Sequence, residues 1–380
     1  MQRQQIRSRT ILALALSIPA TASLGTAQGA SFEGLGFFPG TPAEWSEAHA
    51  VSADGKRVSG FARTPGSDFA MEPFLWQEGT GMIGLGHMPV TGGLEQGRAL
   101  GISGDGTVVV GSGNEGDFGG DTVAFTWTRA AGLVPHGKLF NAFSSTALVA
   151  SHDGSVAGGS SKFIGNGDTG MGGWREGTIF MGGATVGVGS LPGALRSEVF
   201  GISSDGSSAV GVATRPPLEG QSAFRWTAAE GLVDLGDFPA GFDFSAAYAV
   251  SADGSVVVGF GTISFQAAWV TDQRACRWVD GVIEAYPELP FGTFSQANAV
   301  TPDGRTAAGW TRRFGHRQAS VWNEAADALD LHELMEANGI DMSDWTWTEA
   351  TGISASGKVI VGWGRRNSFP GVEAWRAMLP

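Results

Sequence analysis

The sequence predicts an all-β fold, a seven-bladed β-propeller with four strands in each blade, from three observations. A thirteen-residue unit occurs seven times at a near-constant spacing. Each unit has the pattern of a β-hairpin, and two further short strands follow it. Four strands in roughly fifty residues, repeated around a ring, are typical of propeller blades. We expect residues 31–380 to form this single domain.

The repeat unit places an Asp-Gly turn between two apolar runs. Its copies are Ala48–Gly60, Ala99–Gly111, Ala147–Gly159, Val199–Gly211, Ala247–Gly259, Ala297–Gly309 and Ala350–Gly362. Asp-Gly between β-branched runs is the strongest short hairpin signal, and its glycine accepts a positive φ at little steric cost. The last repeat has Ser356 in place of the turn aspartate. The glycine that ends each unit indicates a bulge or a close approach of two backbones.

A third and a fourth strand follow each hairpin. The third carries an aromatic pair, as in Pro73–Trp76, Ala124–Trp127 and Ala223–Trp226, and the fourth is short, as in Gly231–Gly236. In the third repeat, Gly172-Gly173-Trp174 stands where the aromatic motif is expected, whereas in the last repeat we expect Trp375 at the Phe position. These in-register tryptophans occur once per blade, which favours packing between blades over ligand binding.

The two ends of the chain are expected to share one blade. The seventh repeat ends before a fourth strand, and Phe32–Gly36 (FEGLG) matches the fourth strands of other repeats. Pairing of these segments would remove the free sheet edge of an open ring. Leucines and acids alternate over Ala326–Asn338, and this pattern predicts a short amphipathic helix inserted before the final repeat.

Residues 1–30 have the layout of a secretory signal peptide, with arginines before the apolar run Ile11–Ala22 and cleavage expected between residues 22 and 30. We therefore expect an extracellular or periplasmic protein without a membrane span. The net charge of −13 disfavours nucleic acid and anionic lipid as partners. Cys276, the sole cysteine, stands at a Phe position and is expected to be a small buried hydrophobe.

The repeats resemble those of the HAF-type extracellular repeat family. The resemblance rests on Leu191–Gly193 (LPG), AYAVSADGSVVVG (Ala247–Gly259), AFRW (Ala223–Trp226) and GLVDLG (Gly231–Gly236), and on the segment from Asp330 to Gly364. Thr301–Gly304 (TPDG) is also similar to the SPDG turn of TolB-type blades. This resemblance covers the chain from Phe32 onward. It implies an exported propeller and no particular activity.

A candidate binding site is formed by aromatic residues that fall outside the repeat register. Phe61, Phe260, Trp310 and Trp363 directly follow the final glycine of units in contiguous blades, and Trp45 is expected nearby. Apolar rings with polar neighbours suit stacking on a sugar or another amphipathic ligand. The alternative is additional packing between blades.

No catalytic or metal-binding motif is present, and we expect no metal and no cofactor. The six histidines are scattered without metal-ligand spacing. Asp341, Asp344 and Glu349 are the acids that an enzyme would use at the ring mouth. Arg312, Arg313, His316 and Arg317 form a basic loop that is either solvated or recognises an acidic polymer.

The favoured function is a secreted, non-catalytic binding propeller that recognises an extracellular glycan or a surface protein. The alternatives are a polysaccharide hydrolase or lyase on a propeller scaffold and a structural component of the cell envelope. No oligomeric state is predicted.

Overall fold

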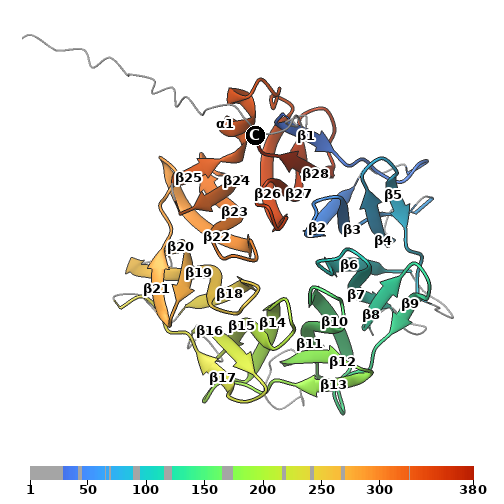
Figure 1. Cartoon of the computed structure of the whole chain (residues 1–380), viewed down its shortest axis with the longest axis vertical. Coiled ribbons are helices and arrows are strands. Elements are labelled where there is room, and N and C mark those ends of the chain that lie inside the picture. The colour runs from blue at the N-terminus through green and yellow to red at the C-terminus, as the bar shows by residue number, and fades with distance from the viewer. Residues whose placement is uncertain are drawn as a thin grey trace, which may run out of the picture.

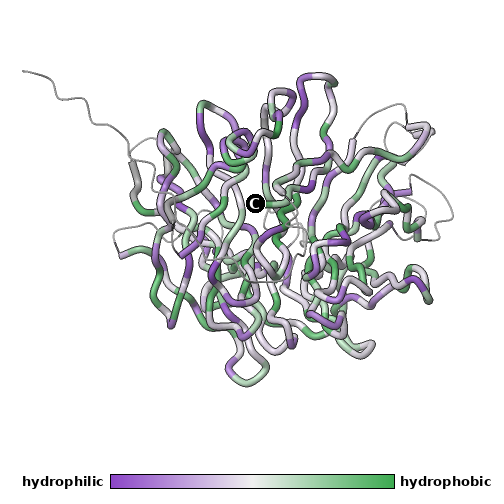
Figure 2. Tube along the Cα trace, turned by 45° about the horizontal axis from the view of Figure 1, so that its top comes forward, coloured by the Kyte–Doolittle hydropathy of each residue, from purple (hydrophilic) through white to green (hydrophobic). Residues whose placement is uncertain are grey.

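The chain forms a ring of seven four-stranded antiparallel sheets, as the sequence predicts (Figure 1). The structure is a computed structural model that describes residues 29–41, 45–64, 66–67, 70–88, 95–114, 122–164, 174–215, 220–239, 244–266, 270–324 and 326–380. The expected signal peptide lies almost wholly outside the described residues. Apolar residues follow the strands within the ring, whereas several projecting loops are hydrophilic (Figure 2).

Six blades consist of four consecutive strands each, and the seventh combines the two ends of the chain. Blades 1 and 2 contain β2 (Ser46–Val51), β3 (Arg57–Arg63), β4 (Met71–Gln77), β5 (Gly81–Gly84), β6 (Gly97–Ile102), β7 (Val108–Asn114), β8 (Thr122–Thr128) and β9 (Gly132–Pro135). Blades 3 and 4 contain β10 (Ser144–Ala150), β11 (Val156–Lys162), β12 (Arg175–Met181), β13 (Ala184–Gly187), β14 (Arg196–Ile202), β15 (Ser208–Thr214), β16 (Gln221–Thr227) and β17 (Gly231–Asp234). Blades 5 and 6 contain β18 (Ser245–Val250), β19 (Val256–Gln266), β20 (Val270–Val279), β21 (Val282–Ala285), β22 (Gly292–Val300), β23 (Thr306–Arg313), β24 (His316–Asn323) and β25 (Ala326–Asp330). Blade 7 contains β26 (Trp345–Ile353), β27 (Val359–Arg366), β28 (Val372–Met378) and β1 (Ser31–Gly34), and α1 (Leu331–Ala337) precedes it.

The glycine that ends each repeat unit is required by a close backbone approach. A Cβ on Gly211 would overlap the carbonyl oxygen of Glu198 on the adjacent strand β14. Beside this contact the register shifts between Val199 and Gly201, which marks a β-bulge. The other six repeats show the same overlap with a carbonyl oxygen and the same shift. Both features predicted from this glycine are therefore present.

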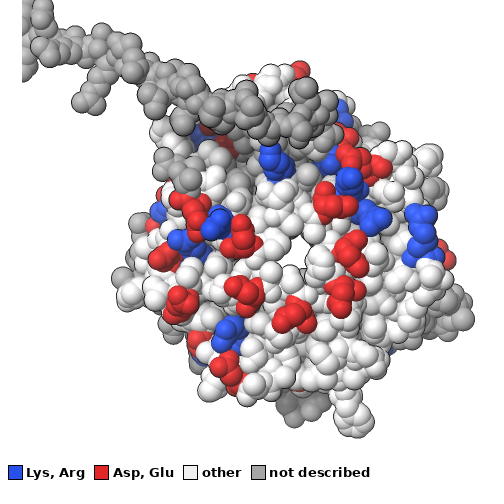
Figure 3. All heavy atoms as spheres, viewed as in Figure 1, with Lys and Arg blue, Asp and Glu red and all other residues white. Residues whose placement is uncertain are grey.

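The Asp-Gly turns lie around the axis on one side of the ring, which we call the turn face. In a typical turn, Asp253 accepts hydrogen bonds from the Ser251 hydroxyl (2.7 Å) and the Ser255 N–H (3.0 Å). The Ser255 N–H and the Ser251 hydroxyl lower the pKa of Asp253 to about 2. Figure 3 looks onto this face and shows acidic side chains around the central opening.

Backbone hydrogen bonds link successive turns into an almost closed ring around the axis. The turn residue Ala53 donates to Gly104 O at 2.8 Å, and Ala355 closes the ring by donating to Ala53 O at 3.0 Å. The same bond joins three further junctions, and from blade 2 to blade 3 the next residue, Asp105, is the donor. From blade 6 to blade 7 the usual donor position holds Pro302, which has no N–H.

A buried hydroxyl connects most blades to the next near the opposite face. At six junctions, the first strand of one blade supplies a Ser or Thr oxygen that accepts from a backbone N–H in the third strand of the preceding blade. The donor–acceptor pairs are Ala124–Ser145, Gly177–Ser197, Ala223–Ser245, Ala275–Ser295, Ala319–Thr348 and Ala374–Ser46, at 2.9 to 3.1 Å.

The remaining junction, from blade 1 to blade 2, has neither partner of this bond. The equivalent donor position is Pro73, which has no N–H, and the equivalent acceptor position is Gly97, which has no hydroxyl. A Cβ on Gly97 would lie 2.8 Å from Pro73 Cδ. The donor is missing at Pro73 and the acceptor is missing at Gly97, so that no buried N–H is left unpaired here.

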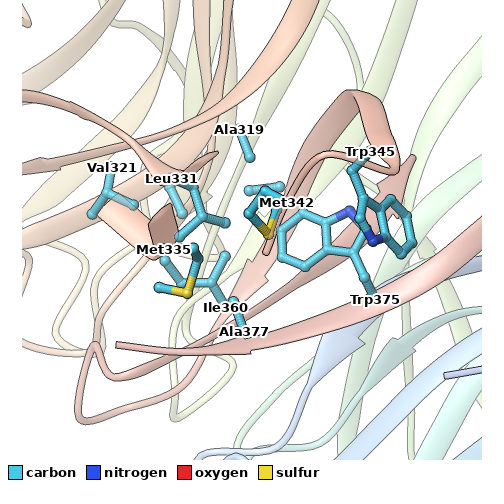
Figure 4. Close-up of a cluster of buried hydrophobic side chains, with 11 residues drawn as sticks. Ala319, Val321, Leu331, Met335, Met342, Trp345, Ile360, Trp375 and Ala377 are labelled. Atoms are coloured by element: carbon cyan, nitrogen blue, oxygen red, sulfur yellow. The ribbon is translucent and has the colours of Figure 1, made fainter. Parts of the chain in front are cut away.

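The N-terminal strand completes blade 7, which confirms the predicted closure. β1 pairs with β28 in antiparallel register from Ser31↔Met378 to Gly34↔Trp375. The Phe32 ring stacks on Trp375, with ring centroids 5.2 Å apart, and packs edge-on against Trp345. Figure 4 shows the core cluster that includes Trp345 and Trp375, to which α1 contributes Leu331 and Met335.

The inserted helix is shorter than predicted. Residues Ala326–Asp330 are not helical, because they form β25, the outer strand of blade 6. Asp330 ends this strand and caps α1, accepting from the backbone N–H groups of His332 and Glu333. Its other carboxylate oxygen lies 2.5 Å from the buried Arg313 guanidinium.

Trp375 pairs with Gly362 and so occupies the predicted Phe position, but the assignment of Trp174 is wrong. In blade 3 the repeat glycine Gly159 pairs with Thr178, and Ala157 pairs with Phe180. Phe180 therefore fills the place that Trp226 has in blade 4. Trp174 lies outside the repeat register, immediately before β12.

Removal of Phe32–Phe38 is expected to lower the melting temperature of a chain that begins at Gly29 markedly or to cause aggregation. The deletion exposes the edge of β28 and removes Phe32 from the core cluster. Differential scanning calorimetry and light scattering measure both effects. If the shortened chain melts like one that begins at Gly29, strand β1 does not close the ring.

Ser245→Ala is expected to cost about 1–3 kcal/mol of unfolding free energy, because the buried Ala223 N–H loses its acceptor. Ser245→Thr keeps the hydroxyl, as Thr348 does at another junction, and should stay near wild type. Urea denaturation of both variants measures the difference. Equal losses in the two variants would mean that packing volume, and not the hydrogen bond, determines stability here.

Candidate binding face

The face opposite the turns, which we call the loop face, carries the exposed aromatic side chains. At this face each second strand ends, each third strand begins and the chain enters each first strand. All exposed aromatic residues among the described residues lie in these connecting segments or at their ends, namely Phe140, Trp174, Phe244, Phe291 and Phe314. Apolar rings that gather on one face of a soluble protein indicate an interaction surface.

Two of these rings are held by an unfavourable backbone conformation. Phe291 and Phe314 have φ of 64° and 49°, in the left-handed region that bulky residues rarely adopt. Their ring centroids lie 5.9 Å apart, and the side chains are 78% and 71% exposed. Because both rings are exposed to solvent, their unfavourable backbone conformation does not serve packing of the core. Residues with strained backbone cluster at functional sites.

Blade 3 presents a second aromatic platform. Trp174 stacks on the buried Phe163 with ring planes 3° apart and centroids at 3.8 Å, and the Phe163 N–H donates to Trp174 O. Phe163 supports one surface of the indole, and Trp174 remains 40% exposed. Both rings line a cleft of about 560 Å³ together with Lys138.

The predicted aromatic arc lies on the same face, but most of its rings are covered. Phe61, Phe260 and Trp310 are buried, while Trp45 and Trp363 are half-buried. Phe61 is enclosed by His49 and by Arg98 of the next blade, whose guanidinium lies 4.9 Å from the ring centroid. Arg317 covers Trp310 at 4.1 Å. Ligand binding through this arc stays a prediction. Of the exposed rings, Phe244 lies beside Phe260, with ring centroids 6.2 Å apart.

Carboxylates lie near the mouth of the central channel on this face, and each has a structural partner. The channel, about 240 Å³ in volume, is lined by the first strands of all blades. Glu349 is buried and accepts from Arg317 Nη1 at 2.5 Å. Burial raises the pKa of Glu349, although Arg317 opposes this effect. Glu47 accepts from Trp45 Nε1 at 2.9 Å, and Glu198 accepts from Arg175 Nη1 at the same distance.

The acids that the sequence suggested for catalysis do not form a pair. Asp344 accepts from the Ser368 hydroxyl and from Arg366 Nε, and these bonds hold its pKa below the usual value. The Ser343 hydroxyl and N–H likewise lower the pKa of Asp341. Glu349 is bound to Arg317. Each carboxylate therefore has its own local partner.

Cys276 is fully buried at its predicted Phe position, and burial raises its thiol pKa. Within the described ranges, no group of three or more His, Cys, Asp or Glu residues is arranged to hold a metal ion. The described part of the chain also contains no helix with the length and apolar character needed to cross a bilayer.

The sequence did not predict the exposed aromatic rings of this face. Trp174 stands where the aromatic motif of the repeat is expected, and this position indicates a core residue. Phe291 and Phe314 carried a usable signal, since each precedes a glycine in a connecting segment. Their exposure and their left-handed backbone follow only from the fold.

Comparison with solved structures agrees with the propeller architecture. The oligogalacturonate lyase from Vibrio parahaemolyticus is 11% identical with a TM-score of 0.55, over 93% of this chain and 97% of that one. The β-propeller domain of the trilobed protease from Pyrococcus furiosus is 10% identical with a TM-score of 0.50, over 74% and 80%. A putative TolB from Agrobacterium tumefaciens is 17% identical with a TM-score of 0.43, over 66% and 83%. No family model and no curated protein matches the chain. The similarities to the lyase and to the protease domain show the fold alone.

Trp310→Ala is expected to cost about 3–5 kcal/mol of unfolding free energy, because the ring is buried beneath Arg317. Trp363→Ala should cost clearly less, since that ring is half-buried. Chemical denaturation measures both values. A near-neutral Trp310→Ala would contradict a packing role for this ring.

Proposed function

We propose that this protein is an exported, non-catalytic binding propeller that holds an extracellular glycan against its loop face. The observation that carries this proposal is the gathering of the exposed aromatic rings on one face, two of them on left-handed backbone. Sugar rings present flat C–H surfaces that pack on aromatic faces, while polar neighbours bind the hydroxyls.

The shape of the face also suits a chain-like ligand. Three separate clefts lie on the loop face. One of about 560 Å³ lies at blade 3, one of about 450 Å³ lies between blades 3 and 4, and one of about 330 Å³ lies at blade 6. Each is within or close to the volume range of small-ligand sites and is open to solvent. Several shallow subsites, in place of one deep pocket, favour an oligosaccharide over a compact metabolite.

The proposal that the protein is not an enzyme is supported by the hydrogen bonds and burial of the glutamates at the channel mouth. Glu47, Glu198 and Glu349 each bind a neighbouring side chain, and Glu349 is buried. General acid–base catalysis needs a carboxyl within reach of the substrate. The similarity to a lyase concerns the scaffold, which hosts many unrelated functions.

Export is part of this proposal. It is supported by the signal-peptide pattern of residues 1–30 and by the resemblance of the repeats to HAF-type extracellular proteins. An extracellular glycan and a periplasmic oligosaccharide both fit this location.

Trp174→Ala is expected to weaken glycan binding about tenfold and to leave the melting temperature nearly unchanged, because this ring is 40% exposed and stacks on one side only. A glycan array first identifies the ligand, and isothermal titration calorimetry then compares the variants. Val282→Ala, an exposed apolar residue on outer strand β21, is the control and should bind like wild type.

Two outcomes would contradict the proposal. Absence of binding to every glycan on the array would remove the glycan-binding function. Release of new reducing ends or unsaturated sugars from a polysaccharide panel would replace binding by catalysis.

A further inference from the structure

Two blades end at the loop face with two cations directly opposite each other. In blade 3, Lys162 on β11 pairs with Arg175 on β12. In blade 6, Arg312 on β23 pairs with Arg317 on β24. Like charges at directly opposed positions of an antiparallel pair are destabilising. Lys162 and Arg312 occupy the same position of the repeat, three residues after the repeat glycine, so this unfavourable pair occurs at equivalent places.

Only one cation of each pair is neutralised. Arg175 binds Glu198 on the first strand of blade 4, and Arg317 binds Glu349 on the first strand of blade 7. These two glutamates are also equivalent in the repeat, each one residue before the start of its unit. Lys162 and Arg312 are exposed, and among the described residues neither forms an ion pair with a carboxylate. Each site therefore presents one uncompensated positive charge.

Both cations line clefts. Lys162, Arg175 and Arg196 surround a cleft of about 450 Å³, and Glu198 is the one carboxylate among the described residues that line it. Arg312 and Arg317 line a cleft of about 330 Å³ together with Phe294 and Trp310. These positive clefts stand out in a chain whose net charge is −13. Their local charge is complementary to an anionic group.

An exposed aromatic platform accompanies each positive cleft. Trp174 directly precedes Arg175, and Phe314 follows Arg312 by two residues and packs on Phe291. The chain enters both blades through an equivalent turn, in which Asn141 and Phe291 have φ of 63° and 64°. Cation, aromatic ring and strained turn thus recur together in blades 3 and 6.

We propose that these two sites bind the acidic groups of an anionic glycan, with Lys162 and Arg312 as the charge-binding residues. The inference rests on the proposed function and names the ligand class. Carboxylate-bearing and sulfate-bearing sugars share the required chemistry, a negative group next to an apolar ring face.

The test compares three oligosaccharides of equal length: one of uronic acid units, one of sulfated neutral hexoses and one of uncharged hexoses. Lys162→Gln and Arg312→Gln are each expected to lower affinity for an anionic oligosaccharide about tenfold, while leaving affinity for the uncharged one unchanged. Their melting temperatures should be equal to wild type or higher, since each substitution relieves a like-charge pair. Lys162→Arg keeps the charge and should retain binding.

Lys56→Gln on the turn face makes the same charge change away from the sites and serves as the control. Stronger binding of either anionic oligosaccharide, lost in Lys162→Gln and retained in Lys56→Gln, supports the inference and identifies the acidic group. Equal binding of charged and uncharged oligosaccharides overturns it and leaves the glycan-binding function intact. Equal losses in Lys162→Gln and Lys56→Gln also overturn it, because the effect would then be long-range charge. Binding of none of the three, with none on the array, removes the proposed function itself.

Discussion

The junction between neighbouring blades is the contact on which the ring depends. A first-strand hydroxyl accepts from a third-strand N–H of the preceding blade at six junctions, and the seventh replaces the pair by Pro73 and Gly97. A closed ring tolerates little variation among its junctions, because an angular error at one must be absorbed by the others. The same hydrogen bond, repeated at a buried position, gives nearly every pair of blades the same spacing. Where the bond is absent, both of its partners are absent together.

Two further constraints fix the first strands, one within each blade and one between blades. The repeat glycine allows a bulge that brings the first and second strands into backbone contact. On the turn face, backbone hydrogen bonds pass from turn to turn around the axis until Pro302 interrupts them. The first strands are thereby fixed at both ends, and the narrow channel between them is a consequence. A frame held in this way can present its connecting segments with defined geometry.

The candidate sites are the places where the chain departs from its own repeat. Trp174 lies out of register, Phe291 and Phe314 adopt left-handed backbone, and Lys162 faces Arg175 across a strand pair. None of these features improves the packing of a blade. Residues that lower stability are expected at functional positions, because there function, and not packing, determines which residue is present. Most aromatics of the predicted arc, by contrast, are buried.

The sequence by itself determined the number of blades, the hairpins and the closing strand. These features depend on local chemistry that recurs, namely the Asp-Gly turn, the β-branched runs and the match of Phe32–Gly36 to the other fourth strands. Tertiary structure alone decided which aromatic rings face solvent. The register of β11 with β12 places Phe180, and not Trp174, in the core. A shift of such a register by one residue moves every side chain of the strand to the other face of the sheet. It also decided the charge of the loop face, because Glu198 and Glu349 neutralise cations of the preceding blade. Such contacts join residues 23 to 32 positions apart across a blade junction, and no local pattern in the sequence specifies them.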